Sequence, residues 1–92
     1  MRVEVTFRGV LAGSLGRGQM IMELDTGSTI AQLLQKMIGV EQNVLRIWKA
    51  PEEVVRDALV LRNGVDIGLT GDLETTLVDG DRVVILPLVH GG

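Results

Sequence analysis

The fold is decided by the stretch Leu77-Val78-Asp79-Gly80-Asp81-Arg82-Val83-Val84-Ile85-Leu86-Pro87. Within it, Asp79-Gly80-Asp81 predicts a tight turn, because aspartate and glycine both favour turn conformations. The residues from Arg82 to Leu86 predict a strand, and their almost unbroken apolar run is typical of burial on both faces and of a central place in a sheet. Pro87 lacks a backbone N–H and is expected to end this strand.

The chain continues from Pro87 through Leu88-Val89-His90-Gly91-Gly92. We expect residues 87–92 to form a flexible arm on a single domain of residues 1–86, with a reach of roughly 20 Å when extended. The two terminal glycines have no Cβ atom, so a narrow channel in a partner could admit them. A glycine pair at this place arises by composition with a probability of roughly 2%, and the alternative is an incidental frayed end.

The amino-terminal half predicts two strands and a helix. Val3, Val5 and Phe7 alternate with polar residues, and a second alternating run over 19–25 follows the glycine-rich segment 13–18. We interpret these runs as a β-hairpin joined by a turn, with Ile21 as an apolar residue on the outer face.

The clearest helix lies over residues 29–38. It is predicted by apolar residues at helical spacing, which are Ile30, Leu33, Leu34, Met37 and Ile38. Thr29 and Gln32 have the spacing of a capping box, and Gly39 is expected to stop the helix.

The middle of the chain carries weaker signals. Residues 44–48 are interpreted as a short strand and residues 51–56 as a short helix or turn. Residues 58–62 predict a strand, which the turn Asn63-Gly64 returns into residues 65–67. The element order predicts an α+β fold with one main helix packed on one face of the sheet.

Composition excludes several classes of function. The chain has no cysteine, one histidine, two aromatic residues and a formal net charge of −3, so we expect no metal site and no nucleic-acid partner. It shows neither a signal peptide nor an apolar run of membrane-spanning length, so we expect a cytoplasmic protein without a membrane partner.

Three stretches together resemble the β-grasp sulfur-carrier proteins of the MoaD/ThiS type. They are residues 61–67, residues 77–87 with the pattern D-G-D-x-V before a proline, and the ending Val89-His90-Gly91-Gly92. The resemblance implies a ubiquitin-like β-grasp with a mixed sheet of four or five strands. Leu88 and His90 replace the proline and alanine that are common in molybdopterin-type endings, and residues 42–57 have no clear counterpart.

This resemblance also implies a function. An E1-like adenylyltransferase would activate the carboxylate of Gly92 with ATP, and the resulting thiocarboxylate would donate sulfur inside a partner such as a molybdopterin synthase large subunit. Gly91 and Gly92 would be the reacting end of a carrier that is no enzyme itself and binds no cofactor. The alternatives are sulfur transfer to thiamine or tRNA, a ubiquitin-like modifier joined to lysines, or an interaction module with an incidental diglycine.

A docking surface is predicted from the alternation of the last strand. Val84 and Leu86 would share a face with Leu59 or Leu61 and form an exposed apolar patch, unless both faces are core. Pro87, Val89 and His90 would extend the contact with partners, although a solvated tail histidine is the plainer interpretation of His90. Arg62 and Arg82 are expected to be exposed strand charges or contacts for acidic partners.

Overall fold

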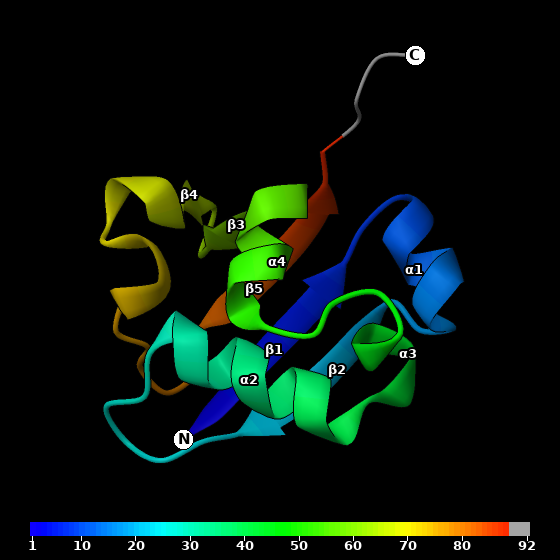
Figure 1. Ribbon diagram of the computed structural model, residues 1–92. Helices are drawn as coiled ribbons and strands as arrows, with labels where there is room; N and C mark the ends of the chain where they lie inside the picture. Colours follow the sequence, from blue (N-terminus) through cyan, green and yellow to red (C-terminus); the bar gives the residue numbers. More distant parts are fainter. Residues whose placement is uncertain (89–92) are drawn as a thin grey trace.

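Five strands form one mixed sheet in the order β2-β1-β5-β3-β4 in the computed structural model, which describes residues 1–88 (Figure 1). In chain order the elements are β1 (Arg2–Phe7), α1 (Val10–Leu15), β2 (Gln19–Glu23), α2 (Ile30–Val40), α3 (Gln42–Leu45), α4 (Pro51–Asp57), β3 (Ala58–Arg62), β4 (Val65–Asp66), the 3₁₀ turns η1 (Ile67–Leu69) and η2 (Asp72–Glu74), and β5 (Arg82–Pro87). This α+β arrangement is the predicted β-grasp, with helix α2 as its main helix.

Strand β5 holds the predicted central position, parallel to β1 and antiparallel to β3. The prediction of burial on both faces is wrong, because α2, α3 and α4 all lie on one side of the sheet (Figure 1). Val83 and Ile85 point to that side and are fully buried, whereas Val84 and Leu86 are partly exposed on the other. The strand also runs one residue further than expected, to Pro87.

Pro87 fits into the strand because of its place in the β3–β5 ladder. The Asn63 N–H donates to the Arg82 carbonyl oxygen at 2.7 Å, and the Leu88 N–H donates to the Asp57 carbonyl oxygen at 3.0 Å. Hydrogen-bonded pairs alternate along an antiparallel ladder, so the pair of Ala58 and Pro87 between them needs no N–H from the proline.

Helix α2 begins with the predicted capping box, which is therefore confirmed. The Gln32 N–H donates to Thr29 Oγ1 at 3.3 Å, and the Thr29 N–H donates to Gln32 Oε1 at 2.8 Å. The apolar stripe of this helix packs on the sheet and is buried throughout. Gly39 does not stop the helix, which continues to Val40, because its backbone keeps a helical rather than a left-handed conformation.

The connection between β1 and β2 differs from the predicted simple turn. The two strands pair antiparallel as expected, but helix α1 lies between them and buries Leu11 and Leu15 in the core. Gly16 ends this helix with φ 74°, a left-handed conformation that glycine adopts at little cost.

Residues 44–48 are helical and loop, so their interpretation as a strand is wrong. Val44 lies in α3, and the Trp48 N–H donates to the Val44 carbonyl oxygen at 2.8 Å. Both side chains are buried, which a single helical turn achieves because positions four apart share a face. The helix predicted next is confirmed as α4, with Pro51 in its first turn.

The hairpin after β3 is confirmed at its turn and is shorter than expected. Asn63 and Gly64 have φ of 50° and 83°, as an Asn-Gly turn requires. Strand β4 pairs through Val65 and Asp66 only, and Ile67, expected in the strand, begins the 3₁₀ turn η1.

Candidate functional site

The uncovered face of the sheet brings the predicted patch residues together. Leu59 is the register partner of Leu86, and Leu61 is the partner of Val84, so the four side chains lie side by side on two neighbouring strands. All four keep part of their surface exposed. We call these residues the apolar patch. Only one face of β5 is therefore core, and the alternative that both faces are core is wrong.

Two arginines border the apolar patch. The Arg8 N–H donates to the Ile85 carbonyl oxygen at 3.1 Å, which places Arg8 beside the end of β5, and Arg82 pairs in register with Glu4. Arg8, Arg82, Glu4 and Val84 contribute to one hollow on this face. Within residues 1–88 neither arginine side chain makes an ion pair. Arg8 is not among the residues predicted for the site, although the alternation over residues 2–8 places it on the open face.

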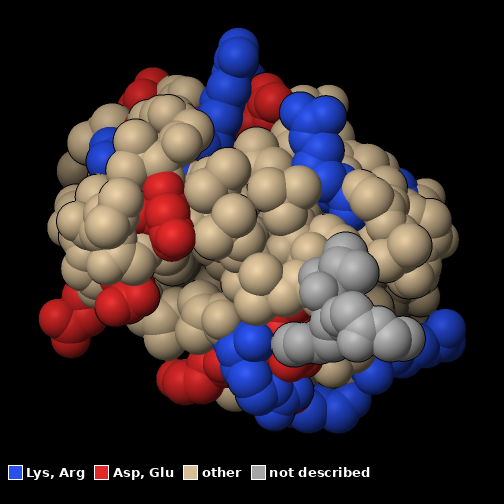
Figure 2. All heavy atoms as spheres, turned by 90° about the horizontal axis from the view of Figure 1, so that it is seen from above, with Lys and Arg blue, Asp and Glu red and all other residues tan. Residues whose placement is uncertain are grey.

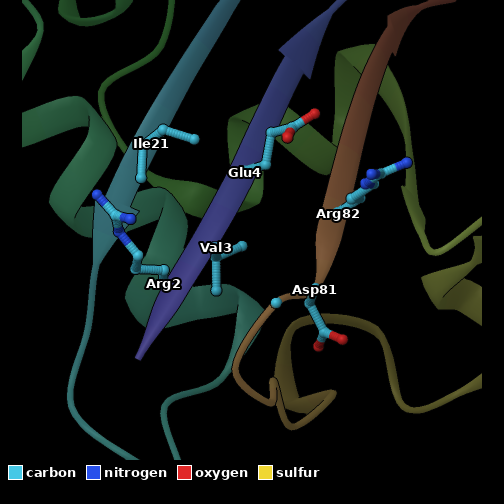
Figure 3. Close-up of a pocket in the computed structure, with 7 residues that line it drawn as sticks. Arg2, Val3, Glu4, Ile21, Asp81 and Arg82 are labelled. Carbon is cyan, nitrogen blue, oxygen red and sulfur yellow. The ribbon is translucent and has the colours of Figure 1, made fainter.

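Charged side chains also surround the edge of the sheet where β5 ends. Figure 2 looks onto this edge and shows a broad uncharged area with basic side chains above and below it and acidic side chains on its left. A second hollow lies further along the open face, where Figure 3 shows Arg2 and Ile21 on one side of β1 and Glu4 and Arg82 on the other. The open face is thus apolar near the end of β5 and charged near its start.

A buried carboxylate fixes the start of β5. Asp81 is 3% exposed and accepts hydrogen bonds from Arg62 Nε at 2.7 Å, Asn63 Nδ2 at 2.9 Å and the Val78 N–H at 2.8 Å. Burial alone would raise the pKa of Asp81, but these donors outweigh it and hold the pKa below its ordinary value. Arg62 is therefore committed to the ion pair, which contradicts its prediction as an exposed strand charge.

The end of β5 is fastened to helix α4. The last carbonyl groups of a helix have no partner within the helix. In α4 the carbonyl oxygen of Asp57 is one of these, and it accepts the hydrogen bond from the Leu88 N–H. The Asp57 carboxylate accepts from Trp48 Nε1 at 3.1 Å and pairs with Arg56 at 2.7 Å. Leu88 is 44% exposed and lines the same hollow as Leu59 of the apolar patch. Pro87 thus lies inside a fixed segment that leads to the chain end.

Four of the predicted site residues, Val89, His90, Gly91 and Gly92, lie outside the described residues. Within residues 1–88 no group of three or more potential metal ligands is arranged to hold a metal ion. In the same part of the chain, no helix has the length and apolarity needed to cross a membrane.

Comparison with known proteins gives a family and several structural relatives. The model of the ThiS family matches residues 5–92. No curated protein matches the chain closely enough to name a relative. Among solved structures, SAMP1 from Haloferax volcanii is 24% identical, with a TM-score of 0.81 and complete coverage of both chains.

Two further solved structures are of complexes. A chain of the Amycolatopsis orientalis BexX/CysO complex is 30% identical, with a TM-score of 0.70 and coverage of 98% of this chain and 99% of that one. A chain of the complex of subunits 1 and 2 of the molybdopterin-converting factor from Helicobacter pylori is 23% identical, with a TM-score of 0.62 and coverage of 100% of each chain. These similarities extend over essentially the whole chain, as the family match does. The protein is therefore a member of the ThiS family, the ubiquitin-like sulfur carriers and modifiers of the β-grasp fold.

Proposed function

We propose that this protein carries sulfur as a thiocarboxylate on Gly92 and delivers it in the biosynthesis of molybdopterin. In this proposal the chain is a protein co-substrate, and an E1-like adenylyltransferase and a sulfur-accepting enzyme perform the catalysis. The observation that carries the proposal is the family match, because it runs to residue 92 and so includes the terminal Gly91-Gly92.

The chemistry needs two steps at the terminal carboxyl group. A free carboxylate is anionic at pH 7 and a poor electrophile. Its oxygen attacks the α-phosphorus of ATP, pyrophosphate leaves, and an acyl-adenylate forms. A sulfur nucleophile at the oxidation level of sulfide then attacks the acyl carbon and expels AMP, which leaves the thiocarboxylate. The ATP is consumed on the activating enzyme, and this chain supplies the carboxylate.

The apolar patch supports the proposal by offering a place for both partners to dock. Its members Val84 and Leu86 lie on β5, the strand that leads to the chain end, and Leu88 fastens the end of that strand to α4. A partner that covers Leu86 is therefore held at a fixed distance from the start of the terminal segment. The flanking Arg8 and Arg82 favour a partner surface with acidic side chains around an apolar centre.

Intact-mass measurement tests the proposal. The purified protein is incubated with ATP, a sulfide donor and the activating enzyme from the same genome, and we expect a mass increase that matches exchange of one oxygen for sulfur at Gly92. Deletion of Gly92 should abolish the exchange while the folded domain persists, because the described core contacts lie within residues 1–88. A deletion variant that still acquired sulfur would overturn the mechanism.

The same preparation from the native cell separates the carrier from a protein modifier. Trypsin cleaves after Arg82, so a lysine joined to Gly92 would retain residues 83–92 as a branch rather than a short Gly-Gly remnant. Peptides with that branch would identify a modifier. Restoration of molybdopterin synthesis in a strain that lacks its small subunit would assign the pathway, and restoration of thiamine or tRNA thiolation instead would reassign it.

A further inference from the structure

A groove outside the apolar patch runs between α4, β3 and the turn η1. Its floor is apolar and is formed by Val55, Ala58, Leu59, Val60, Ile67 and Leu88. It exists because β4 is only two residues long, so the chain leaves the sheet at Ile67 and turns back as a 3₁₀ segment instead of covering β3. Leu59, a member of the apolar patch, also lines this groove.

Two carboxylates stand at the rim of the groove. A Cβ atom built on Gly68 would lie 3.3 Å from Asp66 Oδ1 and 3.7 Å from Asp72 Oδ1, so both oxygens approach one point. Asp66 Oδ1 accepts the Gly68 N–H at 2.8 Å. Within residues 1–88 neither carboxylate forms an ion pair, and no lysine or arginine lines the groove. Figure 2 shows acidic side chains on the left, the side where Figure 1 places the η turns.

The chemistry of this groove defines its occupant. An apolar floor beneath two carboxylates fits a ligand with an alkyl stem and a cationic head. A bound metal ion is disfavoured because the carboxylates are only two, and the floor supplies no further oxygen ligand from a side chain. A compact ammonium group can lie between two separate carboxylates, whereas an arginine fork matches the two oxygens of a single carboxylate.

We propose that the groove receives a lysine side chain of a partner protein. The four-carbon stem lies along the exposed parts of Leu59 and Leu88, and the ammonium group lies between Asp66 and Asp72. Because Leu88 lines one end of the groove, the bound lysine fixes the partner beside the start of the terminal segment. This inference does not depend on sulfur-carrier chemistry, since a partner of either a carrier or a modifier can supply the side chain.

Titration of the ¹⁵N-labelled full chain with Nα-acetyl-lysine N-methylamide tests the site. We expect saturable shifts of the amide signals of Asp66, Gly68 and Asp72, with smaller shifts at Leu59 and Leu88. The norleucine derivative has the alkyl stem without the charge and should give no saturable shifts. Equal responses to the two probes would overturn the proposal, because they would show an apolar groove that does not recognise the cation.

Isosteric variants distinguish lysine binding in the groove from a general attraction of the ammonium group to acidic side chains. Asp66→Asn keeps an oxygen for the Gly68 N–H, and Asp72→Asn suits a residue whose φ is 54°, so both should fold. We expect each to weaken lysine binding about twofold to fivefold, as exposed ion pairs do, and the double variant to abolish it. Glu74→Gln removes an acid of η2 outside the groove lining and should leave binding unchanged.

Three further outcomes would count against the proposal. A loss of binding in Glu74→Gln as large as in Asp72→Asn would reduce the effect to diffuse charge. Stronger saturation by the arginine derivative than by the lysine derivative would reassign the occupant. Shifts of the same amides that grow with protein concentration when no probe is present would assign the groove to a second copy of this chain.

Discussion

The two faces of β5 carry the same kinds of residue in different surroundings. Val83 and Ile85 are fully buried beneath the helices, whereas Val84 and Leu86 face away from them and remain partly exposed. An apolar strand therefore shows that a segment belongs to the centre of a sheet, but not how many of its faces are core. The number of covering layers decides that, and residues 1–88 form a layer of helices on one face of the sheet only (Figure 1).

The largest effect is expected from truncation on the covered face. Ile85→Ala should lower the free energy of unfolding by about 3 to 4 kcal/mol, because it removes buried methyl groups and leaves a cavity. Leu86→Ala, one position along the strand, should cost about 1 kcal/mol, because its side chain is only partly buried. Urea denaturation monitored by circular dichroism measures both. Equal losses would show that the two faces do not differ as described.

Removal of the charge that fixes the start of β5 should have the next largest effect. Asp81→Asn leaves the guanidinium of Arg62 without its carboxylate and should cost about 2 kcal/mol, since a partly buried charge loses its partner. For a domain of this size, that corresponds to a melting temperature lower by about 8 to 16 °C. A thermal scan measures it, and Asp79→Asn on the exposed side of the same turn is the control.

The same pair predicts a pH dependence of stability. The pKa of Asp81 is lower in the folded protein than in the unfolded chain, so protons bind the unfolded chain first as the pH falls. The stabilisation should be complete well above the ordinary aspartate pKa of about 3.9 and should disappear as the pH falls through the folded value. The stability difference between the wild type and Asp81→Asn should therefore shrink below about pH 4. A constant difference would contradict the depressed pKa.

On the uncovered face, a charge should disturb binding more than folding. Leu86→Asp should weaken association with the activating enzyme about tenfold, corresponding to roughly 1.4 kcal/mol, because a central apolar contact is lost. Ile21→Asp is the matched control, since Ile21 is 52% exposed on the same face but lies on β2, outside the apolar patch. Calorimetric titration measures both. Equal weakening would move the docking surface away from β5.

The smallest effect on stability is expected at the start of helix α2, which covers the buried face of the sheet. Thr29→Ala removes the side-chain acceptor for the Gln32 N–H and should cost about 1 kcal/mol. Thr29→Ser keeps the hydroxyl group and should lose less. Denaturation curves measure the difference. A Thr29→Ala variant as stable as the wild type would show that packing on the sheet, rather than the cap, sets the start of α2.

Signals confined to a few neighbouring residues were predictable from the sequence. The capping box of Thr29, the Asn63-Gly64 turn and the strand of residues 82–86 each depend on local conformational preferences, and the structure has all three. The apolar patch was predictable as well, because alternation along β3 and β5 and their register place its members on one face.

Features that depend on tertiary packing were not predictable in this way. Glycines in the segment 13–18 favoured a turn, yet the burial of Leu11 and Leu15 stabilises helix α1. Val44 and Trp48 were compatible with a strand until their burial four residues apart required a helical turn. The groove with Asp66 and Asp72 depends on the early end of β4, which no local pattern indicates.

The pairing of β1 with β5 also constrains how the chain folds. Glu4 lies opposite Arg82, so the central pair of the sheet joins segments from near the two ends of the sequence. Such a contact requires closure of almost the whole chain, and folding rates fall as contacts become more distant in sequence. During synthesis β1 can pair with β2 before β5 is made, but β3 and β4 join this pair only through β5. The last of the five described strands is therefore the one that completes the sheet.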